Sequence, residues 1–153
     1  MRTAERLGDV PIILGEFGLD TTKPGALDYV KAVYSITDQM GASTAYWSRD
    51  NGSWGPYEED GTRRNLVDVV NRPYPRVVAG TPQGWTSAND RLELTVIPNP
   101  KISAPTEFYL PAEAFKNGAK VTGAKIVNWD PQTRILQVEV PGKKKTTVVL
   151  TPA

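Results

Sequence analysis

A single glutamate flanked by glycines is the strongest candidate for chemistry in this chain. Residues 11–14 (PIIL) are apolar, and residues 15–18 (GEFG) follow them directly. An apolar run opened by proline is typical of a parallel strand that is buried on both faces. Glu16 is then expected at the carboxyl end of this strand, the edge where barrels of parallel strands and helices hold their catalytic residues. The neighbouring glycines leave room for a ligand.

The composition limits the chemistry available to such a site. The chain contains no histidine and no cysteine. Imidazole-based triads, thiolate catalysis, disulfides and most transition-metal sites are therefore excluded, and carboxylates remain as the acid and base groups. Retaining glycosidases use two carboxylates about 5 Å apart, one as nucleophile and one as acid and base. Glu16 can supply the nucleophile. The structural alternative is a strand-end glutamate paired with an arginine.

Aromatic residues near the end of a second predicted strand are candidates for binding a sugar. Trp47 closes the predicted strand at 43–47, where a flat indole ring can form an apolar floor beneath a pyranose. Trp54 and Tyr57 lie in a loop rich in turn residues, and exposed aromatic rings on such a loop indicate substrate contact. Core packing is the alternative for Trp47, and packing of the loop is the alternative for the other two. The predicted substrate-binding residues are Trp47, Ser48, Asp50, Trp54 and Tyr57.

Two charged clusters are not predicted to bind a metal ion or a partner. Asp50, Glu58, Glu59 and Asp60 do not match the spacing of an EF-hand, so they are interpreted as a solvated acidic loop, and no metal or cofactor is predicted. The run Lys143–Lys145 precedes the last predicted strand. It is interpreted as protection of a sheet edge against pairing with another chain.

Length and charge narrow the class of protein further. A complete (β/α)8 barrel needs about 250 residues, whereas this chain has 153. If Glu16 belongs to a barrel, most of that barrel lies outside this chain. The net charge is +1 with mixed signs, which argues against nucleic-acid binding. No apolar stretch is long enough to cross a bilayer, so stable membrane insertion is not expected.

The first half of the chain alternates strand and helix patterns. After the strand at 11–14, Pro24 is expected in the first turn of a helix, whose apolar residues recur at helical spacing up to Met40 before Gly41 ends it. The strand at 43–47 and a short helix near 66–70 complete a second unit. The opening residues up to Leu7 are interpreted as the tail of a preceding helix.

The second half changes to a period of two. Apolar and polar residues alternate along 92–96 and 136–140, and further strands are predicted at 106–110, 120–129 and 146–150. Five or more short strands indicate a small antiparallel β-sandwich. The proline-rich stretch at 71–82 is expected to be a stiff connection. The predicted domains are residues 1–76 and residues 77–153.

Several of these segments together resemble the C-terminal part of bacterial endoglycoceramidases, which are members of glycoside hydrolase family 5, and most closely the type I enzymes of actinobacteria. The resemblance runs over nearly the whole chain, and its most distinctive piece is the proline–tyrosine segment that enters the sandwich. The matching segments are ILGEFG at 13–18, YWS at 46–48, WGPY at 54–57 and PYPRVVAGTP at 73–82.

The resemblance implies a fold and an activity. The fold is α/β plus all-β: the last two βα units, with strands seven and eight of a (β/α)8 barrel, followed by a C-terminal antiparallel β-sandwich. Glu16 is then the nucleophile at the end of strand seven, and Trp47 ends strand eight beneath the glucose of the first subsite. The complete enzyme cleaves the β-glycosidic bond between oligosaccharide and ceramide in glycosphingolipids, with retention and without a cofactor.

The resemblance also implies what this chain lacks. The acid/base glutamate and other sugar-binding residues belong to earlier strands, so the chain is expected to be inactive without the rest of the barrel. Its predicted partner is the N-terminal portion of the same enzyme, and secretion from a bacterium is expected.

Two other functions remain open from the residues alone. The sandwich could itself bind carbohydrate or lipid, with Trp85 and Trp129 as platforms, although a tryptophan at a strand end more often packs in a core. A family 5 β-glucanase or β-glucosidase is the other alternative, because one fold serves many substrates.

Overall fold

The computed structural model describes residues 10–153 and divides the chain into two compact units, Met1–Val70 and Asn71–Ala153. The predicted helix tail before Leu7 lies outside the described residues. The division falls ahead of the boundary expected after Arg76. The physical reason is that β3 (Tyr74–Val77) pairs with β6 (Thr106–Tyr109), which ties this segment to the second unit.

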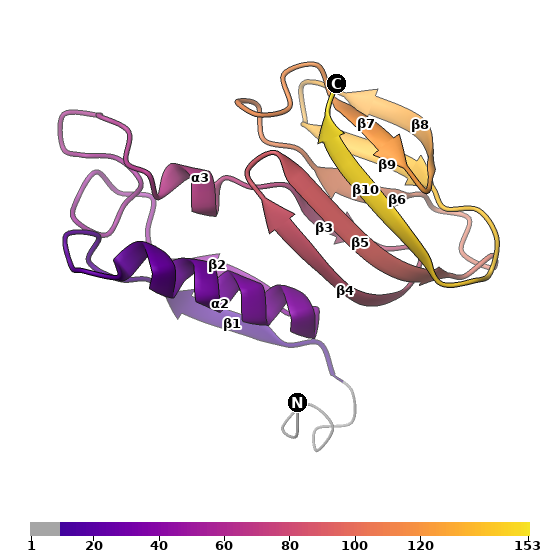
Figure 1. Ribbon diagram of the computed structural model, residues 1–153, viewed down its shortest axis with the longest axis horizontal. Helices are drawn as coiled ribbons and strands as arrows, with labels where there is room; N and C mark the ends of the chain where they lie inside the picture. Colours follow the sequence, from indigo (N-terminus) through magenta and orange to yellow (C-terminus); the bar gives the residue numbers. More distant parts are fainter. Residues whose placement is uncertain (1–9) are drawn as a thin grey trace. The chain divides into compact units, whose positions relative to one another are not determined.

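The first unit follows the predicted alternation of strand and helix (Figure 1). Strands β1 and β2 form a two-stranded parallel sheet, and their connection includes helix α2. The predicted helix is confirmed, but it begins after Pro24 rather than at it. Gly41 ends it in the left-handed conformation, and its N–H bonds to the carbonyl of Asp38. The elements are β1 (Ile13–Phe17), α2 (Ala26–Met40), β2 (Ser43–Tyr46) and α3 (Val67–Val70).

A small aromatic cluster holds these elements together. Phe17, at the end of β1, is buried and meets Tyr34 of α2 edge-on at 5.4 Å between ring centroids. It meets Tyr46 of β2 in the same way at 5.5 Å. Val30 and Leu66 complete the buried set. Phe17 therefore fixes β1 against both its neighbouring strand and the helix that covers it.

Strand β1 differs from the sequence-based expectation in two respects. It extends to Phe17, so Glu16 is its penultimate residue and does not follow the strand. The strand was expected to be buried on both faces, yet 68% of Ile13 and 37% of Leu14 are exposed. The reason is that, within residues 10–153, β2 is the only strand that pairs with β1. A strand of this composition has its apolar residues covered only when further elements pack against it.

The second unit is a sandwich of two four-stranded antiparallel sheets (Figure 1). One sheet has the order β4–β5–β10–β7 and the other β3–β6–β9–β8. The predicted antiparallel sandwich is confirmed in this architecture. Besides β3 and β6, its strands are β4 (Gly80–Ala88), β5 (Arg91–Pro98), β7 (Ala119–Thr122), β8 (Lys125–Asp130), β9 (Ile135–Glu139) and β10 (Thr146–Pro152).

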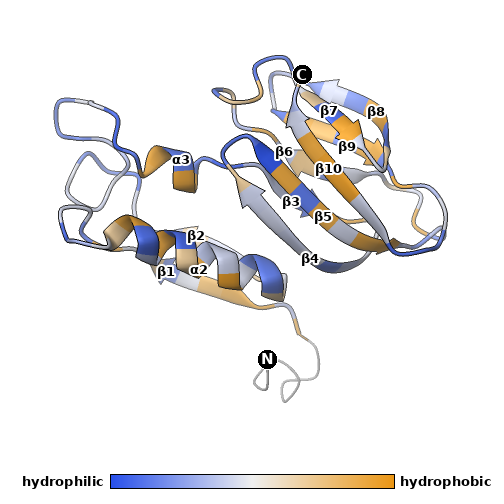
Figure 2. Ribbon diagram, in the orientation of Figure 1, coloured by the Kyte–Doolittle hydropathy of each residue, from blue (hydrophilic) through white to orange (hydrophobic). Residues whose placement is uncertain are grey.

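Alternating side chains build the core of the sandwich. Leu92, Leu94 and Val96 of β5 are fully buried, while the residues between them are partly exposed. Figure 2 shows the apolar bands along β5, β9 and β10 that result from this alternation. The same pattern in β6 buries Phe108, and in β10 it buries Leu150. Because successive side chains of a strand point to opposite faces, the period of two in the sequence gives each of these strands one buried face and one more exposed face.

Two parts of the second unit depart from the prediction. The stretch expected as a stiff connection contributes strands β3 and β4, and the hydroxyl of Ser87 donates to the carbonyl of Pro73. The single strand expected at 120–129 is two strands in different sheets, separated by a turn at Gly123. In both cases a segment became a strand, or was divided into two strands, because of the distant strands with which it pairs. A local sequence pattern does not identify those distant strands.

Among the described residues, no helix has the length and apolar character required to cross a membrane.

Candidate functional site

The parallel pairing of β1 and β2 places Glu16 beside the end of the second strand. Glu16 is in register with Ala45, and the backbone N–H of Trp47 donates to the carbonyl of Phe17 at 2.7 Å. Side chains alternate along a strand, so Glu16 lies on the opposite face from Phe17, which packs against α2. The Glu16 carboxylate and the Trp47 ring therefore belong to adjacent strand ends, as predicted.

Both side chains are accessible. Glu16 is exposed, and 52% of Trp47 is exposed. Neither a hydrogen bond nor an ion pair of the Glu16 side chain occurs within residues 10–153, so the arginine partner of the structural alternative is not present there. An exposed carboxylate with no cation held against it keeps its lone pairs available for attack.

Gly18 allows the two strand ends to approach each other. A Cβ atom at this position would collide with the carbonyl oxygen of Trp47 and would lie 3.3 Å from the ring of Trp54. The peptide bond between Trp47 and Ser48 is cis. By contrast, a Cβ atom at Gly15 would meet nothing within 4 Å. Of the two glycines that flank Glu16 and Phe17, Gly18 is therefore the one required by close packing.

Asp50 organises the loop that follows β2. Its carboxylate accepts hydrogen bonds from the Ser48 hydroxyl and from the backbone N–H of Gly52, the latter at 2.8 Å. These hydrogen bonds hold the pKa of the Asp50 carboxyl below its usual range. Ser48 and Asp50 were predicted to bind substrate. The structure shows them bonded to each other within the loop.

Two further contacts fix the position of Trp54. The Tyr46 hydroxyl donates to the carbonyl of Trp54 at 2.7 Å. Burial, followed by the charge of Asp50, raises the pKa of that hydroxyl. Thr21, in the loop after β1, donates to the carbonyl of Ser53 through both its N–H (2.7 Å) and its hydroxyl (2.6 Å). The loops after the two strands are thus joined, and Trp54 remains 40% exposed beside Gly18.

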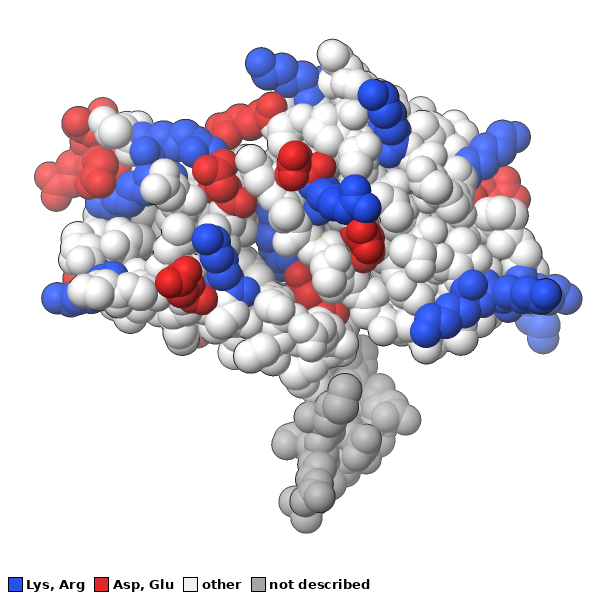
Figure 3. Space-filling model, viewed as in Figure 1, with Lys and Arg blue, Asp and Glu red and all other residues white. Residues whose placement is uncertain are grey.

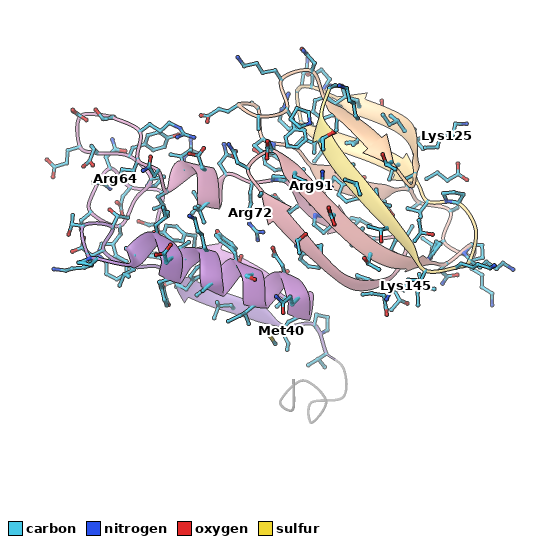
Figure 4. The ribbon with its side chains drawn as sticks, viewed as in Figure 1. Met40, Arg64, Arg72, Arg91, Lys125 and Lys145 are labelled. Carbon is cyan, nitrogen blue, oxygen red and sulfur yellow. The ribbon has the colours of Figure 1, made fainter. Side chains whose placement is uncertain are left out.

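Arg64 is a structural residue of this site that the sequence analysis did not identify. Figure 4 labels Arg64 in the loop region of the first unit. Its guanidinium donates to the carbonyls of Gly52 and Gly55 and forms an ion pair with Glu58. The hydrogen bond with Glu58 raises the pKa of Arg64. Two adjacent arginines after a run of acids are the signal that could have indicated it. Arg64 holds the loop backbone in place, since it binds carbonyls on both sides of Trp54.

The remaining predicted residue and the acidic loop add little to the site. The backbone of Tyr57 pairs with that of Arg63 in an isolated bridge, and its ring is half-buried. In the part of the chain that the structure describes, no group of three or more acids is arranged to hold a metal ion.

This arrangement can bind a sugar ring and attack it. Glu16 can act as the nucleophile, and the exposed ring of Trp47 can serve as an apolar floor. Asp50 is unsuited to act as the proton donor, because its lowered pKa keeps it ionised. The acid/base group of a retaining reaction therefore has to come from another carboxyl group.

The two tryptophans proposed as binding platforms on the sandwich are packing residues. Arg134 lies 4.7 Å from the ring centroid of Trp129, and a Cβ atom at Gly118 would lie 3.3 Å from the same ring. Trp85 packs against the sandwich core with its indole nitrogen buried. Neither ring is available as an open platform, so the geometry does not favour the binding-module alternative in this form.

Comparisons with known proteins identify similarity to glycoside hydrolases. Residues 72–150 match the family described as the glycoside hydrolase family 5 C-terminal domain. No match was found among curated proteins. The solved structure of endo-glycoceramidase II from Rhodococcus sp. is 56% identical, with a TM-score of 0.88, and its alignment covers 99% of this chain and 35% of that chain.

Two further structures of the Rhodococcus protein, a lactosyl-enzyme intermediate and a ganglioside GM3 complex, are also 56% identical and have TM-scores of 0.89. The alignments cover 99% of this chain and 35% and 34% of those chains. Sterylglucosidase 1 from Cryptococcus neoformans shares the fold at 18% identity and a TM-score of 0.70, over 98% of this chain and 30% of that chain. This chain thus spans about a third of the length of the Rhodococcus structures. With more than half of its residues matched to the family, the chain belongs to the glycoside hydrolase family 5 C-terminal domain family.

Proposed function

We propose that this chain is the C-terminal part of a retaining endo-glycosidase that hydrolyses the β-glycosidic bond between oligosaccharide and ceramide in glycosphingolipids. The observation that carries the proposal is the 56% identity, over 99% of this chain, to endo-glycoceramidase II structures that include a lactosyl-enzyme intermediate and a ganglioside GM3 complex. Those relatives carry the type II name, so assignment to the type I enzymes stays a prediction.

In the proposed reaction Glu16 attacks the anomeric carbon of the reducing-end sugar. The bond from that carbon to the ceramide oxygen breaks, and an acid from the preceding part of the enzyme protonates the leaving oxygen. The same group, now a base, then removes a proton from water, which attacks the anomeric carbon and frees Glu16. Glu16 is suited to this role by its exposure and by the absence of an ion pair within residues 10–153.

The N-terminal portion of the same enzyme is the proposed partner. The exposed apolar side chains of Ile13 and Leu14 on β1 support it, because such side chains are normally covered in a parallel sheet. In the proposed assembly the earlier strands extend the sheet beyond β1, complete the barrel and supply the acid/base glutamate. Secretion from a bacterium is part of the same proposal and rests on the resemblance alone.

The proposal is tested by trapping the covalent intermediate. The chain joined to the preceding strands is incubated with a 2-deoxy-2-fluoro-β-lactoside that carries a good leaving group. The fluorine slows both steps, because both transition states resemble an oxocarbenium ion, and the leaving group keeps the first step fast enough for the covalent intermediate to accumulate. Peptide mapping is expected to find the added fluorosugar mass on Glu16. The label on another residue, or no label on a sample that hydrolyses lactosides, would contradict the proposal.

Trp54 is proposed to flank the ceramide. Its ring is 40% exposed and is held in place through its backbone by Tyr46. Trp54→Ala is expected to lower kcat/KM for a glycosphingolipid about tenfold more than for a soluble aryl lactoside, since a large apolar contact is lost only with the lipid. Equal loss with both substrates would remove Trp54 from the lipid site. The same pair of substrates distinguishes this enzyme from a family 5 β-glucosidase.

A further inference from the structure

One end of the sandwich gathers basic and apolar residues that the proposed hydrolysis does not use. We define the sandwich tip as the β5–β6 connection at 99–105, the β9–β10 connection at 140–145, and Ile126 and Val127 of β8. Both connections join one sheet to the other, and residues of each, together with Val127, line a common groove of about 450 Å³. The lysines and Ile126 lie outside its lining. Figure 1 shows the β9–β10 connection beside the β5–β6 connection at this end of the unit.

The lysines of the tip were predicted to protect a sheet edge, and this prediction is wrong. Residues Lys143–Lys145 lie in the connection before β10, and β10 is a central strand between β5 and β7. All three are exposed, as is Lys101 on the facing connection. Figure 3 shows the blue side chains that gather at this end of the molecule, where Figure 4 labels Lys145.

These charges are available to a ligand. No ion pair of Lys101 or of Lys143–Lys145 occurs within the described residues. Glu139 is the only acid among the described residues that line the groove, and it lies in register with Lys125 of the neighbouring strand. The tip is therefore strongly basic, although the whole chain carries a net charge of only +1.

Exposed aliphatic side chains lie among these lysines. Val127 is 56% exposed and sits at a bulge of the edge strand β8, directly after Ile126, which is 45% exposed. Ile102, on the β5–β6 connection, is 43% exposed. The bulge re-aims side chains that regular alternation would turn to opposite faces. The groove itself is lined by polar and apolar groups in similar measure, with prolines from both connections.

We propose that the sandwich tip docks on the surface of an anionic lipid bilayer. Lysines with long stems beside exposed aliphatic residues are the combination that interfacial binding requires: the charges attract anionic headgroups, and the apolar side chains enter the boundary between headgroups and acyl chains. A bilayer fits better than an acidic protein for a structural reason. The basic residues occupy two connections that also border exposed aliphatic side chains, and an acidic protein partner would leave those isoleucines and the valine without a matching surface.

Docking by the tip requires neither Glu16 nor a particular substrate. The sandwich holds the chain at a membrane surface, reversibly and without insertion of a helix. Binding is therefore expected to be weak for each contact and to fall as salt screens the lysines.

Vesicle flotation of the full 153-residue chain tests the proposal. Binding is expected to vesicles of phosphatidylcholine with about 30% phosphatidylglycerol at about 0.05 M salt, and to be largely lost at about 0.5 M salt. Pure phosphatidylcholine vesicles are expected to bind at least about tenfold less. Failure of the chain to bind anionic vesicles at low salt would overturn the proposal. So would retention on polyglutamate without vesicle binding, which would assign the tip to an acidic protein.

A matched pair of double variants identifies the surface. Lys143→Gln with Lys144→Gln removes two charges from the tip. Lys116→Gln with Lys120→Gln removes two charges from the other end of the sandwich, where Lys120 is in register with Thr151 near the end of β10. The tip variant is expected to bind anionic vesicles about 10- to 30-fold more weakly, and the control less than about threefold more weakly. Equal losses would mean that net charge alone drives binding, which contradicts a docked tip.

The apolar contribution has its own variant. Val127→Ser changes an exposed side chain, so the fold is expected to survive, which circular dichroism checks. Binding to anionic vesicles is expected to fall about three- to tenfold while its dependence on salt stays the same. If binding does not change, the tip binds through charge alone, and the proposal that its aliphatic side chains enter the bilayer is wrong.

Discussion

The two units of this chain satisfy the same packing requirements to very different extents. The second unit buries leucine, valine and phenylalanine side chains between two four-stranded sheets. The first unit buries a small cluster around Phe17 beside a two-stranded sheet, and leaves Ile13 and Leu14 of β1 exposed. An antiparallel sandwich closes its core with its own strands, whereas parallel strands have their second face covered only by further βα units.

The difference separates the region with the large buried core from the region with the candidate site. The sandwich has the features of an independently stable domain, and its two candidate sugar platforms are occupied by packing. The first unit carries the exposed carboxylate and the ordered aromatic loop, and it offers an uncovered strand. We therefore expect changes in the first unit to alter activity in the assembled enzyme, and changes in the sandwich core to alter stability.

The largest expected effect concerns Glu16. In the enzyme assembled with the preceding strands, Glu16→Gln is expected to lower kcat/KM for an aryl lactoside by about 10⁴-fold or more, because the amide cannot form the glycosyl ester. Glu59→Gln, an exposed acid on the loop after β2, is the control and is expected to leave the rate within about twofold. Substantial turnover by the Glu16 variant would show that another residue is the nucleophile.

The next effect tests the sandwich core. Phe108→Ala removes a fully buried ring and is expected to lower the free energy of unfolding by about 3–5 kcal/mol in urea titrations. Ile126→Ala, in the same sheet but 45% exposed, is expected to cost less than about 1 kcal/mol. Similar losses in both variants would mean that the interior of the sandwich is not the tightly packed core described above.

The third effect compares the glycines at 15 and 18. Gly18→Ala places a methyl group against the carbonyl oxygen of Trp47, so the two strand ends must separate. We expect a loss of about 1–3 kcal/mol in unfolding free energy together with a fall in activity. Gly15→Ala meets no atom within 4 Å and is expected to have little effect on stability. If the alanine at position 15 were the more damaging, the close approach at Gly18 would not be the constraint.

The smallest effect is a dependence on pH in the sandwich. Hydrogen bonds from the Thr133 hydroxyl and from the backbone N–H groups of Gln132 and Thr133 lower the pKa of Asp130 from its reference value of 3.8. Because the pKa is lower in the folded state, this contribution is present above about pH 4 and is lost as the pH falls through the lowered value. Asp130→Asn keeps an acceptor but cannot titrate. Its urea midpoint should therefore decline less between pH 6 and pH 2, and an unchanged slope would exclude Asp130 as a contributor.

The sequence predicted local features well and partners poorly. Helical spacing from Leu27 to Met40 and the stop at Gly41 predicted helix α2, which the structure confirms. Alternation along 92–96 and 136–140 predicted two central strands of the sandwich. The strand at Tyr74–Val77 was missed because prolines mark a connection locally, and only its pairing with β6 makes this segment a strand.

The candidate site was predicted in part for the same reason. Residue type and position indicated Glu16 and Trp47 before their strands were known to be adjacent. The pattern did not reveal that Asp50 accepts from Ser48, nor that Arg64 binds the loop carbonyls on both sides of Trp54, since such contacts join residues that no period relates.

The sequence by itself determined the identity of the chemically able groups. Without histidine or cysteine, carboxylates remain as the natural acid and base groups, and the apolar run before Glu16 indicated the strand that displays one of them. The tertiary structure alone decided which neighbours those groups have. In the structure β1 pairs with β2, and the Asp50 carboxylate accepts hydrogen bonds within its own loop. Arg134 packs over the ring of Trp129, and lysines from two distant segments lie at one end of the sandwich. Side-chain chemistry and local periodicity can be identified from consecutive residues. Contacts between distant segments depend instead on which apolar faces of strands and helices pack together to exclude water.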